Sequence, residues 1–105
     1  ETPSGRAYLL PDRPWSRRVS GAFGNHLARV EPALAHAVLT HKANGGYLVS
    51  VRAPRLNPAG ADDLCRQFET GGGRKSAAGI NHLPESELAR FLASFGTAFN
   101  RENPS

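Results

Sequence analysis

The spacing of apolar residues in the first third of the chain predicts a strand followed by a helix. Ala7–Leu10 is a short apolar run that ends at Pro11, which is typical of a strand. From Ser16 onwards, apolar residues recur at steps of three and four, which predicts a helix that ends before Pro32. Its apolar face contains Val19, Phe23, Leu27 and Val30.

The middle of the chain predicts a β-hairpin. Ala33–Thr40 and Tyr47–Ala53 are two β-compatible runs, and Asn44-Gly45-Gly46 between them tolerates the positive φ angles of a tight turn. Successive side chains of a strand point to opposite faces, so Ser50 and Arg52 share one face of the second strand. Tyr47, Val49 and Val51 take the other face.

Helix and strand signals alternate again towards the C-terminus. Asn57-Pro58 has the pattern of a helix N-cap followed by proline at the first helical position. Ala77–Leu83 is a short strand, and Pro84 opens a last helix. The buried residues of the two helices are predicted to be Ala61, Leu64, Cys65 and Phe68, then Leu88, Phe91, Leu92, Phe95 and Phe99. The predicted order β-α-β-β-α-β-α indicates an α/β fold with a mixed sheet and packed helices.

The length and composition fit one compact domain over residues 1–105, with residues 100–105 as a frayed tail. Since the chain contains no methionine, a native start is missing, and we expect residues 1–105 to be a piece of a longer protein. The net charge is +4, and residues 1–60 hold eight basic and three acidic residues while residues 61–105 hold five and six. This surplus favours anionic partners.

Cysteine and histidine do not predict a metal site or a nucleophile in this chain. Cys65 is the single cysteine and lies on a predicted apolar face, so we expect a buried thiol, no disulfide and a reducing, cytoplasmic location. No apolar run reaches the roughly 18 residues of a membrane span, so we expect no membrane partner. The four histidines, His26, His36, His41 and His82, lack the spacing of metal ligands.

Gly71-Gly72-Gly73-Arg74-Lys75-Ser76 is the strongest local signal for ligand binding. Glycines let a backbone turn its N–H groups towards an anion, while two cations and a hydroxyl add charge and hydrogen bonds. The spacing is not that of a Walker loop. A flexible connection between a helix and a strand explains the same residues equally well, so the pattern leaves both interpretations open.

A wider pattern resembles the DHH-associated domain, the C-terminal half of DHH-family phosphoesterases. Ser50-Val51-Arg52, Asn57-Pro58 and Gly71-Gly72-Gly73-Arg74 followed by Ala77-Ala78-Gly79 carry the resemblance, which is firm over residues 47–83. Members include RecJ-type exonucleases, nano-RNases, cyclic-dinucleotide phosphodiesterases and exopolyphosphatases. The resemblance implies a hydrolase whose Mn²⁺ or Mg²⁺ ions are held by a separate N-terminal DHH domain of the same chain.

The resemblance implies that Arg52 and the glycines Gly71, Gly72 and Gly73 contact the substrate. The local pattern adds the loop cations Arg74 and Lys75, and Ser50, which we expect to orient backbone or substrate, to the predicted binding set. We expect no catalytic residue and no metal ligand in this chain. Arg74 departs from the family, whose loop reads Gly-Gly-Gly-His. Arginine keeps a permanent charge for phosphate but cannot act as a neutral imidazole, so whether the parent protein hydrolyses its ligand stays open.

Other functions remain open at this stage. The implied ligand is a nucleotide, an oligonucleotide or a polyphosphate, and a non-catalytic nucleotide- or nucleic-acid-binding module fits the same residues. A structural or dimerisation role, with a homo-oligomer, is a third possibility. Arg13, Arg17 and Arg18 surround Trp15 as in single-strand binding patches, but Trp15 matches the helix stripe, so we expect it in the core.

Overall fold

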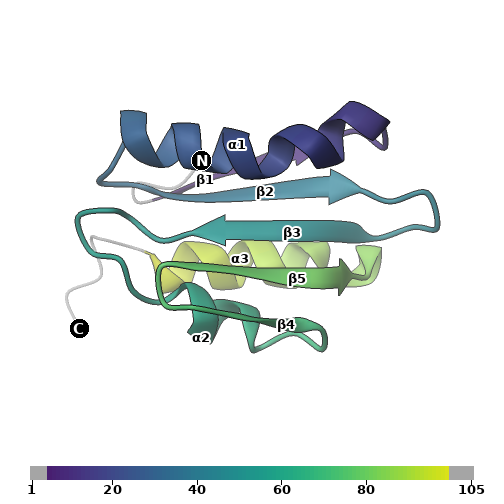
Figure 1. Ribbon diagram of the computed structural model, residues 1–105. Coiled ribbons are helices and arrows are strands. Elements are labelled where there is room, and N and C mark those ends of the chain that lie inside the picture. The colour runs from purple at the N-terminus through teal and green to yellow at the C-terminus, as the bar shows by residue number, and fades with distance from the viewer. Residues whose placement is uncertain (1–4, 100–105) are drawn as a thin grey trace.

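Five strands form one mixed sheet with helices on both of its faces (Figure 1). The structure is a computed structural model and describes residues 5–99. Its elements are β1 (Gly5–Leu10), α1 (Pro14–Val30), β2 (Ala35–His41), β3 (Tyr47–Arg52), α2 (Ala61–Cys65), β4 (Gly71–Gly73), β5 (Ala77–Leu83), the 3₁₀ turn η1 (Glu85–Glu87) and α3 (Leu88–Ala98). The predicted α/β class and mixed sheet are confirmed.

The sheet has the strand order β1-β2-β3-β5-β4. Helix α1 connects β1 to β2, and these two strands are parallel, as expected where a helix forms the crossover. The remaining pairs are antiparallel. Strands β1 and β4 are therefore the two edges of the sheet.

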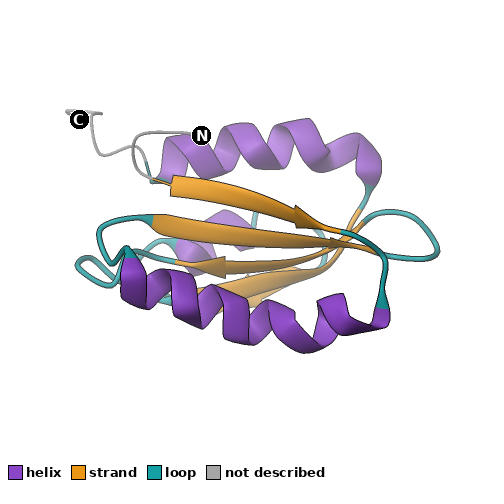
Figure 2. Cartoon of the chain, turned by 90° about the horizontal axis from the view of Figure 1, so that it is seen from above, coloured by secondary structure: helices purple, strands orange, loops and turns teal. Residues whose placement is uncertain are grey.

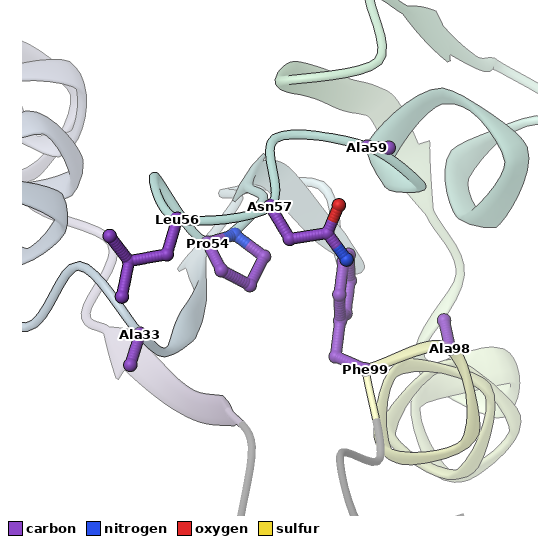
Figure 3. A pocket seen from close by; sticks show the side chains of 7 residues that line it. All are labelled: Ala33, Pro54, Leu56, Asn57, Ala59, Ala98 and Phe99. Atoms are coloured by element: carbon purple, nitrogen blue, oxygen red, sulfur yellow. The ribbon is translucent and has the colours of Figure 1, made fainter. Parts of the chain in front are cut away.

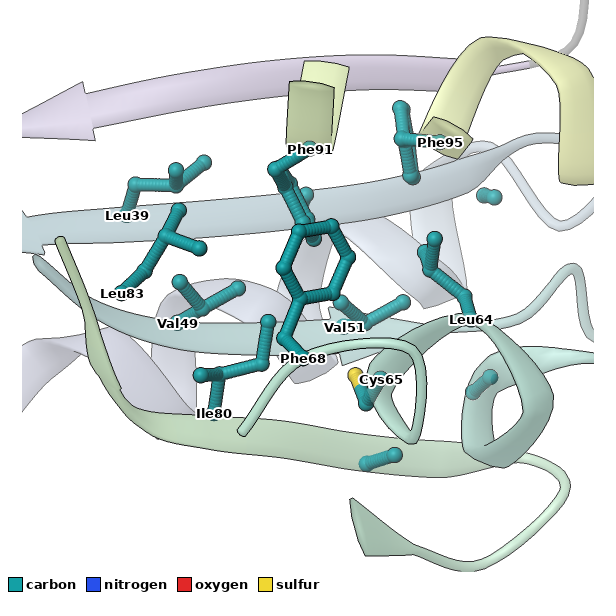
Figure 4. Close-up of a cluster of buried hydrophobic side chains, with 14 of the residues drawn as sticks. Leu39, Val49, Val51, Leu64, Cys65, Phe68, Ile80, Leu83, Phe91 and Phe95 are labelled. Carbon is teal, nitrogen blue, oxygen red and sulfur yellow. The ribbon is translucent and has the colours of Figure 1, made fainter. Parts of the chain in front are cut away.

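Helix α1 covers one face of the sheet, and α2 and α3 cover the other (Figures 1 and 2). The main hydrophobic core lies under α2 and α3, where Phe68, Phe91 and Phe95 meet alternate residues of the strands (Figure 4). The buried aromatic stripe predicted for the last helix is confirmed. Within residues 5–99, no helix has the length and apolar character that a membrane crossing requires.

The central hairpin forms as its sequence predicts. Gly45 and Gly46 have φ angles of 90° and 78°, so the turn needs residues without a side chain. Tyr47, Val49 and Val51 are buried in the main core. The intervening residues of β3 therefore face α1.

Helix α1 begins at Pro14, two residues before the predicted start, and ends at Val30 as predicted. Leu27 is 8% exposed and packs inwards, but Val30 is 56% exposed. Trp15 is 47% exposed, so its predicted place in the core is wrong. The helix packs on β2 and β3, and Phe23 meets Tyr8 of β1 edge to face. Of the stripe residues whose side chains the structure describes, Leu27 is buried, Phe23 is partly buried and Val30 is exposed.

Helix α2 begins at Ala61, and the prediction that Asn57-Pro58 caps it is wrong. Gly60 precedes the helix with a φ of 103°, a conformation that favours glycine. The N–H of Ala61 donates to the carbonyl of Lys75 at 3.0 Å. This long-range bond fixes the helix start, which local sequence could not show.

The glycine run forms the short edge strand β4, which the sequence prediction treated as a loop. A Cβ on Gly71 would lie 1.7 Å from the carbonyl oxygen of Cys65, so the chain passes too close for any side chain. Gly73 has a φ of 143°. Two of the three glycines are therefore explained by the fold itself.

Candidate functional site

Arg52 lies on β3 and Arg74 in the turn between β4 and β5, but their side chains reach the same face of the sheet. Arg52 of β3 pairs with Ala77 of β5. Ala77 and Arg74 exchange two backbone hydrogen bonds, of 2.8 and 3.3 Å, across the β4–β5 hairpin. Side chains of directly opposite residues point to the same face, which is the face that α1 covers further along the sheet.

Four arginines line one pocket on this face: Arg29 of α1, Arg52 of β3, Arg55 of the following loop and Arg74 of the hairpin. The pocket has a volume of about 550 Å³. Its other described lining residues are Asn25, Ala53, Pro58, Ser76 and Ala77. Since none of these is acidic, the side chains that meet here offer positive charge and hydrogen-bond donors.

Arg52 is held in place by neutral partners. Its Nη1 donates to the hydroxyl of Ser50 at 2.8 Å, and its Nε donates to Oδ1 of Asn25 at 3.2 Å. Asn25 lies on α1 and Ser50 on β3, so the guanidinium bridges the helix and the sheet. Because neither partner carries a charge, the positive charge of Arg52 remains available to a ligand.

The electrostatics of the pocket also favour an anion. Burial lowers the pKa of Arg52, and the nearby charge of Arg74 lowers it further. Arg6, Arg66 and Arg90 form ion pairs with acidic side chains, and none of these three arginines lines the pocket. The pocket thus concentrates like charges that a bound anion would neutralise.

The structure brings together some of the predicted site residues. Arg52 and Arg74 line the pocket, and Ser50 supports Arg52. Gly72 does not line it, but Gly72 pairs with Gly79, which pairs with Ser50, so Gly72 lies on the same face. A Cβ added to Gly72 would meet nothing within 4 Å.

The other predicted residues lie elsewhere. Gly71 and Gly73 alternate with Gly72 and therefore face away from Arg52. The side chain of Lys75 is exposed outside the pocket, and its backbone carbonyl accepts the bond from Ala61. Their predicted contacts with substrate stay predictions without a supporting position in the structure.

Sequence reasoning missed Asn25, Arg29, Arg55 and Ser76. Asn25 and Arg29 are four residues apart, so they share a face of α1, but the apolar stripe drew attention to the opposite residues. The basic surplus of residues 1–60 was the one available signal. It showed that cations gather in this half without showing where.

The other candidates for a site have little chemistry to offer. A pocket of about 280 Å³ lies between the loop after β3 and the end of α3 (Figure 3). Its described lining residues are Leu56, Asn57, Phe99 and small residues, none of them charged. Burial raises the pKa of the Cys65 thiol to about 12, so this thiol is a poor nucleophile. Among the described residues, no group of His, Cys, Asp and Glu could hold a metal ion.

The structure describes only some side chains of the predicted basic patch around Trp15. Trp15 and Arg13 are both exposed. The side chains of Arg17, Arg18 and Val19 lie outside the part of the chain whose side chains the structure describes. Trp15 borders a pocket with Leu10, Ala22 and Phe23, on the β1 side of α1, whereas the arginine pocket lies on the β3 side.

The chain was also compared with known proteins. No family model matches it, and no curated protein matches it either. The resemblance to the DHH-associated domain therefore stays a prediction from the sequence motifs.

Proposed function

We infer that this domain binds the phosphate groups of its ligand in the pocket formed by Arg29, Arg52, Arg55 and Arg74. The observation that carries this proposal is the convergence of four guanidinium groups from four segments, with no acidic side chain among the described lining residues. Guanidinium groups present a planar fork of donors that matches phosphate oxygens. The basic net charge of the chain adds long-range attraction for an anion.

The proposal includes the role that the sequence resemblance implies. The domain would position a phosphorylated substrate for a phosphoesterase, and a separate DHH domain would hold the Mn²⁺ or Mg²⁺ ions and perform hydrolysis. The residues described here do not form a ligand set for such ions, so we derive no hydrolytic step from them. Arg52 and Arg74 would contribute binding and orientation of the substrate.

A non-catalytic nucleotide- or nucleic-acid-binding module is the second candidate. The residue that favours it is Arg74, which stands where the resembled family has histidine. Arginine retains the affinity for phosphate but cannot exchange a proton near neutral pH. Both candidates require the same anion pocket.

Titration of the protein with pyrophosphate tests the pocket directly. A charge-assisted hydrogen bond contributes about 1.5–3 kcal/mol, so Arg74→Ala should weaken binding by on the order of 10- to 100-fold. Arg74→Lys should recover part of the loss, because a point charge cannot replace the planar fork. Isothermal titration calorimetry at low salt measures both.

Lys75→Ala is the matched control, because it removes a neighbouring charge that does not line the pocket. It should change the affinity much less than Arg74→Ala. If Arg74→Ala binds pyrophosphate as tightly as the unmodified protein, the pocket is not the anion site. A structural role would then be favoured.

A further inference from the structure

The four arginines divide into two pairs by their place in the fold. Arg52 of β3 and Arg74 of the β4–β5 hairpin both lie opposite Ala77, so they face the same side of the sheet, and the charge of Arg74 lowers the pKa of Arg52. Arg29 and Arg55 are exposed and lie on α1 and on the loop after β3. Each pair can contribute two positive charges to the same pocket.

The amount of charge exceeds what a single phosphate would neutralise. A terminal phosphate carries about −1.5 to −2 charges at neutral pH, so it matches one pair of arginines and leaves the other uncompensated. A phosphodiester carries one negative charge and matches even less. Two or more directly linked phosphates would neutralise both pairs within one pocket.

The described lining residues of the pocket include no side chain on which a base could stack. Single-stranded nucleic acids are usually held by aromatic side chains on which the bases stack. The described lining residues include no aromatic side chain, and the small residues Ala53, Ser76 and Ala77 offer no stacking surface. The recognition available here is therefore directed at phosphate oxygens.

The geometry points to a ligand with a run of at least two directly linked phosphates, one held by Arg52 and Arg74 and the next by Arg29 and Arg55. This inference rests on the proposed function, because it specifies what the same anion pocket selects. The shared chemistry is a condensed phosphate, which either an inorganic oligophosphate or the diphosphate group of a nucleotide supplies. Asn25 acts as a positioning residue, since its Oδ1 accepts from Arg52.

Calorimetric titration of the whole chain with tripolyphosphate, pyrophosphate, ADP and orthophosphate tests the inference. Tripolyphosphate should bind about 10-fold or more tightly than orthophosphate, because it adds at least one charge-assisted contact. If ADP binds as tightly as pyrophosphate, the diphosphate group of a nucleotide can serve as the condensed phosphate that the pocket binds. ADP that binds clearly more weakly would support the same site with inorganic chains.

Arg29 and Arg55 provide the specific variants. Arg29→Ala and Arg55→Ala should each weaken tripolyphosphate binding by about 10-fold and leave orthophosphate binding within about twofold. Arg66→Ala is the control, because Arg66 pairs with Asp62 on α2 and lies outside the pocket. If Arg66→Ala has the same effect as Arg29→Ala, net charge alone explains the binding and the inference is wrong.

The possible failures of this inference and of the proposed function differ. Equal affinity for orthophosphate and tripolyphosphate would overturn the inference and leave the phosphate-binding function intact. A single-stranded oligonucleotide without terminal phosphates that binds more tightly than tripolyphosphate would overturn it in favour of a nucleic-acid site. Absence of binding by every one of these anions would overturn both.

Discussion

The three consecutive glycines of β4 differ in whether the fold requires a residue without a side chain at their position. Gly71 passes so close to the carbonyl of Cys65 that a Cβ would lie 1.7 Å from its oxygen. Gly73 has a φ of 143°, which L side chains rarely adopt. Gly72 has neither constraint, because a Cβ there would meet nothing within 4 Å. A run that could be either an anion-binding loop or a flexible connection is instead an edge strand in which Gly72 is the unconstrained position.

We therefore expect Gly71→Ala and Gly72→Ala to affect stability very differently. Gly71→Ala must shift backbone at α2 and should lower the free energy of unfolding by about 2 kcal/mol or more. Gly72→Ala adds a methyl group to open space and should change it by no more than about 0.5 kcal/mol. Urea unfolding followed by circular dichroism measures both. Equal losses would show that the two positions do not differ as the structure indicates.

At the level of single residues, the sequence predicted part of the site. Arg52 and Ser50 follow from strand alternation, and Arg74 follows from the glycine motif and the resemblance. Arg29 and Arg55 could not be predicted, because a helix face and a loop meet the strand only after α1 has docked. The local pattern contains no information on that tertiary contact.

The packing of α1 on the sheet buries a titratable side chain. His36 of β2 is 1% exposed, and neither ring nitrogen has a hydrogen-bond partner among the described residues. Its pKa is lowered by burial and by the charge of Arg6, and Glu31 opposes the shift. The folded state therefore favours the neutral imidazole at this position.

This burial predicts that the fold loses stability in mild acid. Above about pH 6.5, the ordinary pKa of histidine, the imidazole is neutral in the folded and the unfolded chain. Below that pH the unfolded chain takes up the proton first, so the free energy of unfolding falls until the lowered pKa of the folded state is reached. The slope contributed by this group is at most about 1.4 kcal/mol per pH unit.

Variants separate this contribution from other protonation events. His36→Leu should remove part of the pH dependence, because the replacement is apolar and cannot be protonated. His26→Leu, which replaces an exposed histidine of α1, is the matched control. Urea unfolding midpoints between pH 7.5 and pH 5.5 measure the slope for each protein. An unchanged slope in His36→Leu would exclude His36 as its source.

At the level of elements, alternation and periodicity predicted the strands and helices that cross the core. β2, β3 and β5 have apolar residues on the face that contacts the hydrophobic core, and α3 contributes Phe91 and Phe95 to the same core. The start of α2 and the strand β4 were missed. Both depend on bonds between distant segments, such as that from Ala61 to Lys75. The prediction used the local capping pattern at Asn57, which does not include these long-range bonds, and it therefore placed the start of α2 too early.

Charge is distributed unequally over the whole molecule. Arg6, Arg66 and Arg90 form ion pairs with acidic side chains. The four arginines of the pocket converge without an acidic residue among its described lining residues. Such a concentration of like charge contributes repulsion to the unliganded fold, which a bound anion would relieve. A binding role and a structural role of these arginines therefore predict opposite effects on stability.

Removal of Arg74 should stabilise the unliganded protein. Arg74 is exposed, its side chain has no hydrogen bond or ion pair within residues 5–99, and its charge acts on Arg52. We expect Arg74→Gln to raise the free energy of unfolding by up to about 0.5 kcal/mol at low salt. This gain should disappear near 1 M salt, where the Debye length is about 3 Å. Arg66→Gln, which breaks the ion pair with Asp62, should instead leave stability unchanged or lower it.

The same variant links stability to binding across the molecule. Pyrophosphate should raise the melting temperature of the unmodified protein, because an anion that binds only the folded state stabilises it. Since Arg74→Gln has lost a contact with that anion, its melting temperature should rise less at equal concentration. Differential scanning calorimetry with and without pyrophosphate measures both effects. A lower stability of Arg74→Gln without ligand, together with an unchanged response to pyrophosphate, would show that Arg74 supports the fold and does not bind the anion.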